Sequence, residues 1–321
     1  MATNIAVLGF GRTGVSVGLA LADAKKGITR IGFDEDKALV KVAKKNKAFD
    51  EYPSSVKAAV SKADIVVLDV PVDRLRTIFT LIAPLMKEDS ILINTAPLVV
   101  ASNRWAQDLL PESIHFINVI PAYNYESMED VNRDAKNASA DLFEKSLIFI
   151  AGDTQTRKEV IDVAVDLCVI LGGTPYFTDP DELDGLIANV VLLPQFVAAA
   201  LAGATMLQPG WDDNQRLASN IFHLALKPLE LVNETEDYGI SLLQNKKSVM
   251  PVIEKYIQIL QDLYKLIEED DNEGLSDYLF DILLTRKEWL AKRKEGKWHY
   301  HLSTSVPLKS EALQRFTRFS S

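Results

Sequence analysis

A glycine-rich turn near the amino terminus constrains the fold of this chain more than any other feature. A short apolar run, Ile5–Leu8, leads into Gly9, Gly11 and Gly14, which have the spacing G-x-G-x-x-G, and an Ala/Leu-rich segment follows. The first glycine permits a tight strand-to-helix turn, the second lets the backbone approach a pyrophosphate, and the third lets the helix pack closely on the strand. The next apolar run ends in Asp34, where a carboxylate would meet the adenosine ribose hydroxyls. The pattern therefore predicts a dinucleotide-binding βαβ unit.

Two kinds of pattern divide the chain, and the change falls at about residue 178. Before that point, continuous apolar runs alternate with helical patterns, which is typical of a parallel sheet covered by helices on both faces. After it, the patterns are helical and no convincing strand occurs. We therefore expect an α/β protein with an N-terminal Rossmann doubly wound parallel sheet in residues 1–178. An all-α helical domain in residues 179–295 and a partly ordered C-terminal tail in residues 296–321 would follow.

Composition and charge exclude several other classes of protein. The net charge of the 321 residues is −10, which argues against binding of nucleic acid. The single cysteine, Cys168, cannot form an internal disulfide, and no spacing of His, Cys and Asp is typical of a metal site. The apolar segment Leu186–Leu207 is interrupted by Asn189, Pro194 and Gln195, so we expect a core or interface helix and no membrane span. These features predict a cytoplasmic protein.

Four segments of the chain occur in the order and spacing of motifs in one known family. They read GFGRTGVSVGLAL at Gly9–Leu21, ADIVVLDVPV at Ala63–Val72, LLPQFVAAAL at Leu192–Leu201 and GWDDNQRLA at Gly210–Ala218. These segments resemble the motifs G-x-G-x-x-G-x-S-x-x-x-A-L, ADlVvlavPv, HLPHxxAxAL and GFRDxTRIA of prephenate dehydrogenase and its arogenate-using relatives. The resemblance covers about residues 4–285 and implies a Rossmann domain followed by a helical domain.

The positions that carry histidine in that family are occupied by other residues here. Ile120 stands where the catalytic histidine of the family's HPMaGxE turn would be, and Leu183 replaces the histidine of its HD motif. Leu192 and Gln195 replace the two histidines of HLPH. In the family, the imidazole accepts a proton from a ring hydroxyl while hydride leaves for the nicotinamide, a role that isoleucine cannot perform. The losses together predict a changed substrate rather than one damaged residue.

Three residues remain as candidates for proton transfer: Glu126, Asp184 and Asn189. Burial near the family's histidine position could raise the pKa of Glu126 enough for it to act as an acid or a base. Each candidate also has a structural interpretation. Glu126 could pair with Arg216, Asp184 could be stabilised by a helix dipole, and Asn189 could be a hydrogen-bonded amide in the core. A tyrosine or water could transfer the proton instead.

Arg216 matches the arginine that binds a substrate carboxylate in the family. A guanidinium can hold a carboxylate through two parallel hydrogen bonds, although a surface position on a helix is the alternative interpretation. By the same resemblance, Gln195, Asn124 and Tyr123 would face the substrate, while Tyr123 could also merely pack. We therefore expect a small substrate that carries a carboxylate.

The cofactor would be bound by the glycine turn, by the acid after the second strand and by the ends of the next two strands. These residues are Gly9, Phe10, Gly11, Arg12, Thr13, Gly14, Asp34, Val70, Pro71 and Asn94. A carboxylate at Asp34 accepts hydrogen bonds from ribose hydroxyls and repels a 2′-phosphate, which favours NAD over NADP. NADP stays as the alternative because Arg12 and Lys37 could soften that repulsion.

The leading hypothesis is a NAD(P)-dependent oxidoreductase of prephenate dehydrogenase type, which transfers a hydride between a nicotinamide cofactor and a small carboxylate-bearing substrate. The resemblance also implies tyrosine biosynthesis and a homodimer built through the helical domain. An imine reductase or a β-hydroxy acid/keto acid reductase is a second hypothesis within enzymes. A third is a non-catalytic sensor or subunit that binds a dinucleotide without turnover.

Overall fold

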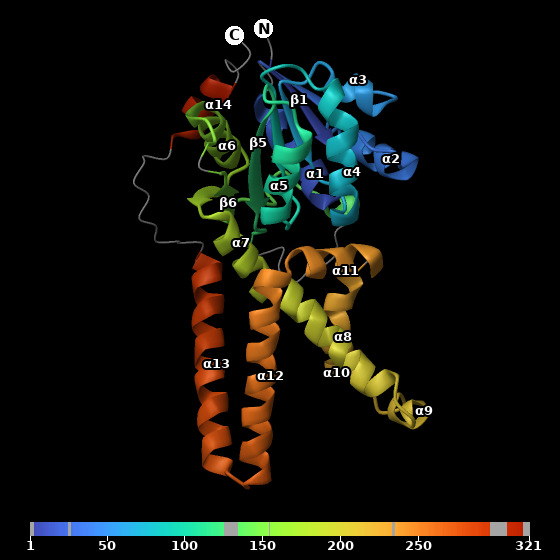
Figure 1. Cartoon of the computed structure of the whole chain (residues 1–321), viewed down its shortest axis with the longest axis vertical. Helices are drawn as coiled ribbons and strands as arrows, with labels where there is room; N and C mark the ends of the chain where they lie inside the picture. The colour runs from blue at the N-terminus through green and yellow to red at the C-terminus, as the bar shows by residue number, and fades with distance from the viewer. Residues whose placement is uncertain are drawn as a thin grey trace.

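A computed structural model of the chain describes residues 3–24, 27–124, 134–153, 155–232, 235–295 and 307–316. Figure 1 shows an α/β part in the upper half of the molecule and, below it, two helical arms that diverge. The α/β part is built from the chain up to Phe177 together with a helix at Lys309–Phe316, and the arms are built from the helices between them. This division agrees with the change of pattern along the sequence.

A seven-stranded sheet forms the centre of the α/β part, with the strand order β2-β1-β3-β4-β5-β6-β7. The strands are β1 Thr3–Leu8, β2 Ile28–Phe33, β3 Ile65–Leu68, β4 Ile91–Asn94, β5 His115–Pro121, β6 Leu147–Ala151 and β7 Thr174–Phe177. The strand order reverses at β1, whose two neighbours are β2 and β3. In doubly wound sheets, ligands bind at the carboxyl ends of the strands beside such a reversal.

One strand pair differs from the parallel sheet that the pattern predicted. Strands β1 to β5 pair in parallel and β7 is parallel to β6, but β6 runs antiparallel to β5. A parallel pair needs a crossover connection, usually a helix. Among the described residues between β5 and β6, the only helical element is the short 3-10 helix η4 Ala135–Asn137. The chain therefore returns beside β5 in the opposite direction.

Helices cover both faces of the sheet, as predicted for a doubly wound fold. They are α1 Arg12–Ala20, α2 Lys37–Lys45, α3 Val56–Val60, α4 Val72–Ile82, α5 Val100–Leu109 and α6 Lys158–Ile170, with 3-10 turns η1 Leu21–Ala24 and η2 Ala83–Leu85. Ile5 and Val7 of β1 are buried in a cluster with α1 and α6, whereas Ala6 and Leu8 are buried in another with α4 and α5. Successive strand residues point to opposite faces, so β1 contributes to both cores.

From Pro180 to Glu295, every element that the structure describes is a helix. These elements are α7 Pro180–Ile187, η5 Ala188–Leu192, α8 Leu193–Met206, α9 Trp211–Asn214, α10 Asn220–Leu226, η6 Lys227–Leu231, α11 Thr235–Gln244, α12 Lys246–Glu268 and α13 Asn272–Glu295. Helices α7, η5 and α8 form one continuous helix, in which η5 is a π-helical turn. The π turn comes just before Pro194, which has no N–H to donate to the preceding turn.

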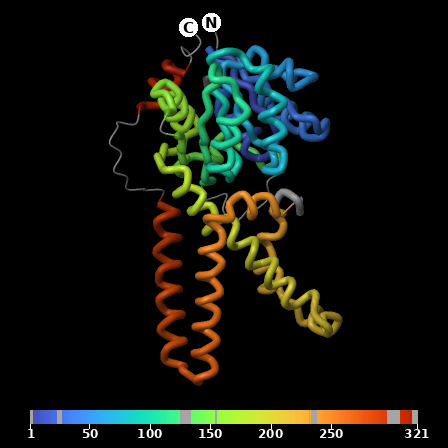
Figure 2. The backbone as a smooth tube through the Cα atoms, viewed as in Figure 1, coloured from blue at the N-terminus to red at the C-terminus, as the bar shows by residue number. Residues whose placement is uncertain are grey.

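The two arms leave large apolar side chains exposed. Figure 2 shows the yellow arm, α8 to α10, diverging from the orange and red hairpin of α12 and α13. Of the described residues, only the helix Pro180–Met206 has the length and apolar composition of a membrane span, and 28% of its most apolar window is buried within the chain. A single helix of this kind is a weak indication of a membrane protein, because core and interface helices share the same composition.

The end of the chain returns to the α/β part. Helix α14 Lys309–Phe316 lies beside α6, where Ala312 and Phe316 are fully buried (Figure 1). The hydroxyl of Thr3 donates to Phe316 O at 3.0 Å, and Arg315 forms an ion pair with the buried Asp166. This part of the tail is therefore an ordered helix that covers one face of the sheet.

Candidate active site

The glycine loop has the geometry that its sequence requires. Gly9 has a φ of +96°, a conformation that side chains disfavour, and a side-chain carbon there would lie 1.9 Å from Asp69 O. A side-chain carbon on Gly14 would lie 2.3 Å from Gly9 O, which explains the tight packing of α1 on β1. The loop also joins the second strand, because Gly9 N donates to Phe33 O at 2.9 Å. These contacts place the start of α1 at the carboxyl ends of β1 and β3.

Asp34 lies against this loop. Its Oδ2 accepts a hydrogen bond from Phe10 N at 2.7 Å, and its Oδ1 accepts one from Asp36 N at 2.7 Å. Burial raises the pKa of the Asp34 carboxyl, while the two backbone N–H groups act in the opposite direction. A carboxylate oxygen can accept more than one hydrogen bond, so both oxygens can still receive ribose hydroxyls. The structure thus brings together the loop and the acid that the sequence predicted to act together.

A second carboxylate on the loop was missed by the sequence reasoning. Asp69 follows β3, and its Oδ2 accepts a hydrogen bond from Gly14 N at 2.6 Å. A side-chain carbon on Gly11 would lie 2.7 Å from that same oxygen. In the sequence, Asp69 is an acidic residue at the end of an otherwise apolar run, and that run resembles a family motif.

Tyr123 contacts the glycine loop from the other side. Its hydroxyl lies 2.9 Å from Thr13 Oγ1, and the guanidinium of the buried Arg12 lies 5.3 Å from the centre of its ring. Arg12 Nε also donates to Asn137 O at 3.1 Å. Arg293 at the end of α13 donates to Tyr123 O at 2.8 Å. Sequence reasoning gave no functional role to Arg293, since its partner lies far away in the chain.

The other predicted cofactor contacts lie at the ends of β3 and β4. Val70 is beside the loop, with Cγ1 3.4 Å from a side-chain carbon built on Gly9, and Pro71 is the residue that directly precedes α4. Asn94 is fully buried, and its Nδ2 donates to Ala96 O at 3.0 Å and to Asn118 Oδ1 at 2.9 Å. The amide of Asn94 thus shapes the loop after β4, while its contact with a cofactor stays a prediction.

Three of the positions that carry histidine in the resembling family meet in one apolar cluster. This interdomain cluster consists of Val99, Ile120, Ala151, Leu183, Ile187, Ala188, Leu192 and Val249. Ile120, Leu183 and Leu192 are the three substituted positions, and Gln195, the fourth, is also buried. The replacements belong to a single packed unit that joins the sheet to α7, η5 and α12. An apolar unit of this kind holds no group that could accept a proton.

Asp184 is buried at the edge of the interdomain cluster. Only 2% of its surface is exposed, and its two oxygens accept hydrogen bonds from Val99 N at 2.9 Å and Val100 N at 3.0 Å. These N–H groups begin α5, whose own N-cap residue provides no side-chain cap. Burial raises the pKa of Asp184, and the two N–H donors oppose that rise. A carboxylate of α7 therefore caps a helix of the α/β part.

The remaining predicted residues are dispersed within one chain. Asn189 is exposed and its Nδ2 donates to Gly185 O at 2.7 Å, so it is not a core amide in the single chain. Asn124 is buried and donates to Asp141 O at 2.8 Å. Arg216 is exposed beyond α9 at the far end of the yellow arm, 3.5 Å from Asp213 (Figure 1). Glu126 lies outside the described residues.

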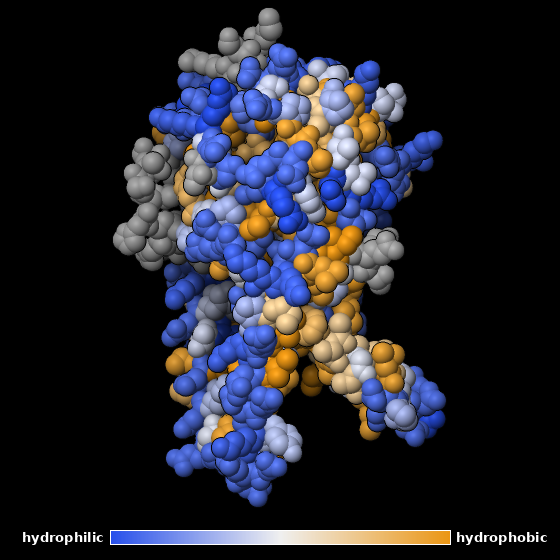
Figure 3. Space-filling model, in the orientation of Figure 1, coloured by the Kyte–Doolittle hydropathy of each residue, from blue (hydrophilic) through white to orange (hydrophobic). Residues whose placement is uncertain are grey.

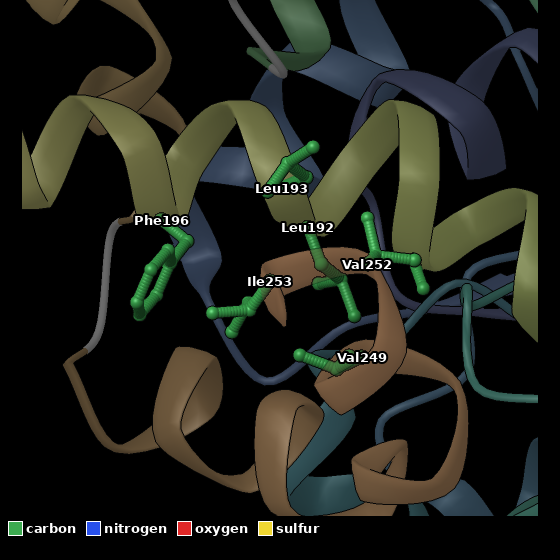
Figure 4. Close-up of a pocket in the computed structure, with 7 residues that line it drawn as sticks. Leu192, Leu193, Phe196, Val249, Val252 and Ile253 are labelled. Carbon is green, nitrogen blue, oxygen red and sulfur yellow. The ribbon is translucent and has the colours of Figure 1, made fainter. Parts of the chain in front are cut away.

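A small apolar hollow adjoins the interdomain cluster. It contains about 150 Å³ of empty space, part of it open to solvent, between η5 and α8 on one side and α12 on the other. Figure 4 shows its lining side chains, which are Ala188, Leu192, Leu193, Phe196, Val249, Val252 and Ile253. All of them are apolar.

Within the part of the chain that the structure describes, no group of three or more His, Cys, Asp or Glu residues could hold a metal ion.

The fold and the glycine loop are those of a dinucleotide-binding protein. Residues 17–175 match the family model described as prephenate dehydrogenase, nucleotide-binding domain, and residues 179–281 match prephenate dehydrogenase, dimerization domain. The chain therefore belongs to the prephenate dehydrogenase family. Membership confirms the predicted family, the α/β fold with its helical second part, and NAD(P)-dependent dehydrogenase chemistry in general terms.

Two curated relatives and two solved structures illustrate the similarity. The cyclohexadienyl dehydrogenase of Zymomonas mobilis subsp. mobilis is 24% identical over 280 residues, which cover 86% of this chain and 92% of that one. The prephenate dehydrogenase of Bacillus subtilis is 24% identical over 328 residues, which cover 96% of this chain and 82% of that one. The prephenate dehydrogenase of A. aeolicus with hydroxyphenyl propionate and NAD+ has a TM-score of 0.77 at 20% identity, covering 90% and 98%. The Synechocystis arogenate dehydrogenase has a TM-score of 0.70 at 21% identity, and the match covers 89% of this chain and 100% of that one.

Proposed function

We propose that this chain transfers hydride between NAD and a small carboxylate-bearing substrate, and that it does so without a histidine base. The observation that carries the cofactor half of the proposal is Asp34, whose carboxylate is held 2.7 Å from Phe10 N beside the glycine loop. The substrate half is supported by the relatives, one of which was solved with hydroxyphenyl propionate, a carboxylate. The proposal that no histidine acts as the base is supported by Ile120, Leu183 and Leu192, which occupy three of the family's histidine positions and pack in the apolar interdomain cluster.

Asp34 supports NAD rather than NADP. A carboxylate that accepts ribose hydroxyls repels a 2′-phosphate at the same place. The test compares wild type with Asp34→Ala by calorimetric titration of NADH and NADPH. We expect the variant to lose affinity for NADH and to lose little or none for NADPH. Equal losses for the two nucleotides would remove the ribose role from Asp34.

The chain's own residues divide the chemistry among them. The bound nicotinamide would supply the hydride acceptor, and the glycine loop would orient it from the start of α1. The interdomain cluster would exclude water beside it. The candidates for proton transfer are the Tyr123 hydroxyl beside Thr13 and Asp184, whose two oxygens also accept the N–H groups that begin α5. Glu126 and water stay as further candidates for this step.

The activity test uses two panels of compounds. Prephenate and arogenate are offered with NAD, while imines and 2- or 3-keto acids are offered with NADH, and the nicotinamide absorbance is followed. Gly9→Ala is the matched control, because a side chain there collides with Asp69 O and should abolish cofactor binding. Turnover in the first panel supports the proposal. Turnover only in the second assigns the reductase alternative, and tight NADH binding without turnover in either assigns the sensor.

We also propose that the active form is a homodimer that covers the apolar arms. Figure 3 shows hydrophobic side chains on both arms. The largest exposed examples include Leu207 at 82% and Leu217 at 88% on one arm, and Phe280 at 67% on the other. Exposed apolar surface of this extent is typical of an interface. A dimer would also cover the apolar helix Pro180–Met206, in keeping with a cytoplasmic protein.

The dimer would give Arg216 access to a substrate. Arg216 closely follows α9, which lies at the far end of its arm, away from α1 and the glycine loop of the same chain (Figure 1). Sedimentation at micromolar concentration should give twice the mass of one chain. Mixing and refolding Gly9→Ala with Arg216→Ala chains should then restore activity that neither variant has alone. A monomer mass, or no restoration from a stable mixed dimer, would contradict this role.

A further inference from the structure

A carboxylate stands on the glycine loop beside the position where the sequence predicts a pyrophosphate. Asp69 Oδ2 is 2.6 Å from Gly14 N, and it is the atom that a side chain on Gly11 would meet first, at 2.7 Å. The backbone of Asp69 is fixed as well, since its N–H donates to Leu8 O at 2.8 Å. The second and third glycines of the loop therefore make room for Asp69.

The start of α1 is where an anion should bind. The first N–H groups of a helix have no partner inside it, and the helix dipole places partial positive charge there. A diphosphate uses these groups in dinucleotide-binding folds. Here Phe10 N donates to Asp34 and Gly14 N donates to Asp69, so carboxylates hold donors at both ends of the loop. The N–H groups of Arg12 and Thr13 lie between them.

Two guanidinium groups contact Tyr123, whose hydroxyl meets the loop at Thr13. Arg12 is only 5% exposed and lies over the ring of Tyr123, and Arg293 donates to Tyr123 O. A diphosphate at the start of α1 would be attracted by these groups and repelled by Asp69. Repulsion between like charges is strong at a few ångströms in a partly buried place, where salt screens it poorly.

We propose that Asp69 is a built-in anion that competes with the cofactor's diphosphate for the start of α1. The loop consequently holds the dinucleotide more loosely, and releases it faster, than its glycines and arginines alone would allow. Asp69 is a positioning residue in this role and takes no part in hydride transfer. The inference rests on the proposed function, because it requires that a dinucleotide binds this loop.

The test measures binding rather than turnover. Wild type, Asp69→Asn and Asp69→Ala are titrated with NADH by calorimetry, and NADH release is timed by stopped-flow displacement. Asp69→Asn keeps the side chain's size and an acceptor for Gly14 N, so it isolates the charge. The matched control is Asp89→Asn, which removes an equal charge from a residue that precedes β4 and is 81% exposed in its side chain. Thermal unfolding by circular dichroism reports whether each variant is folded.

Both Asp69 variants should bind NADH roughly tenfold more tightly and release it correspondingly more slowly, as expected for removal of one unit charge near a diphosphate. Inorganic pyrophosphate, titrated alone, should also bind the same variants more tightly than wild type. Asp89→Asn should match wild type within about twofold, because its charge is distant and screened.

A role in shaping the loop predicts the opposite sign. If Asp69→Asn binds NADH with unchanged or weaker affinity while wild type binds it, Asp69 does not compete and the inference is wrong. If Asp69→Ala fails to fold, Asp69→Asn alone decides. If neither wild type nor any folded variant binds NADH or NADPH, the cofactor proposal itself is wrong, and the role of Asp69 falls with it.

Discussion

The buried carboxylate of Asp184 has a structural role that can be tested separately from a catalytic one, by measuring the free energy of unfolding. Its two oxygens accept hydrogen bonds from Val99 N and Val100 N at 2.9 and 3.0 Å, at the start of α5. Replacement by alanine leaves both N–H groups without this acceptor in a place where the side chain was only 2% exposed. Each hydrogen bond to a charged group contributes about 1.5–3 kcal/mol. Relief from burying a charge offsets part of that loss.

We therefore expect Asp184→Ala to lower the free energy of unfolding by about 2–4 kcal/mol, measured by urea denaturation followed by circular dichroism. Asp184→Asn keeps one acceptor oxygen and should lose about half as much. The matched control is Asp181→Asn on the same helix, whose partner Lys247 is exposed. Its urea midpoint should equal that of wild type, because exposed ion pairs stabilise little.

The pH dependence of the same measurement has a definite sign. Burial raises the pKa of Asp184, so the folded protein keeps this proton to a higher pH than the unfolded chain does. Between the ordinary carboxyl pKa and the raised value, the folded state binds more protons, and stability falls as pH rises. Asp184→Asn removes this dependence, so its deficit relative to wild type should shrink as pH rises through that window.

Two results would refute the capping role. One is an Asp184→Ala protein whose urea midpoint matches that of Asp181→Asn. The other is an Asp184→Ala protein that is fully stable and binds NADH normally but has lost all turnover, which would assign Asp184 to proton transfer. A loss of stability together with retained turnover in Asp184→Asn would leave the cap as its main role.

Three further predictions concern the loop, the cluster and the tail. Gly9→Ala should abolish NADH binding in titrations, because its side chain would lie 1.9 Å from Asp69 O; normal affinity would contradict the loop geometry. Ile120→His should lower the free energy of unfolding by about 1–3 kcal/mol, and burial should hold the imidazole pKa below its ordinary value in an NMR titration; an unshifted pKa would mean that the cluster is wet. Phe316→Ala should destabilise by about 3 kcal/mol or release α14, detected by hydrogen exchange, whereas exposed Leu308→Ala should change neither; equal behaviour would refute docking of the tail.

Much of the fold could be predicted because its signals are local. The glycine spacing and the acid that follows β2 belong to one βαβ unit, so a short stretch of sequence contains the whole motif. The apolar strand runs and the helical second half follow from periodicity in the same way. The direction of β6 could not be predicted from such local signals. A buried strand reads as a continuous apolar run whether its neighbour is parallel or antiparallel, so the pattern could not reveal the antiparallel pair.

The candidate site depended more on contacts between distant residues. Asp69 and Gly14 are far apart in the chain, and nothing in the spacing of either shows that a carboxylate would reach the loop. The same is true of Arg293 and Tyr123, which lie in different halves of the protein. Helix α14 is short and mostly polar, so its two buried residues could not be recognised without α6. Each of these features becomes visible only after the sheet has assembled.

The three substituted histidine positions show how such contacts change the interpretation of a sequence. Taken one by one, Ile120, Leu183 and Leu192 are three separate losses of a titratable group. In the structure they pack together with Val99 and Val249, so the interior that they form is one unit. A single imidazole returned to this unit would be desolvated and would lack a polar partner among the cluster's side chains. We therefore expect the proton-transfer group to lie beside the cluster, with Tyr123 and Asp184 as the candidates, rather than within it.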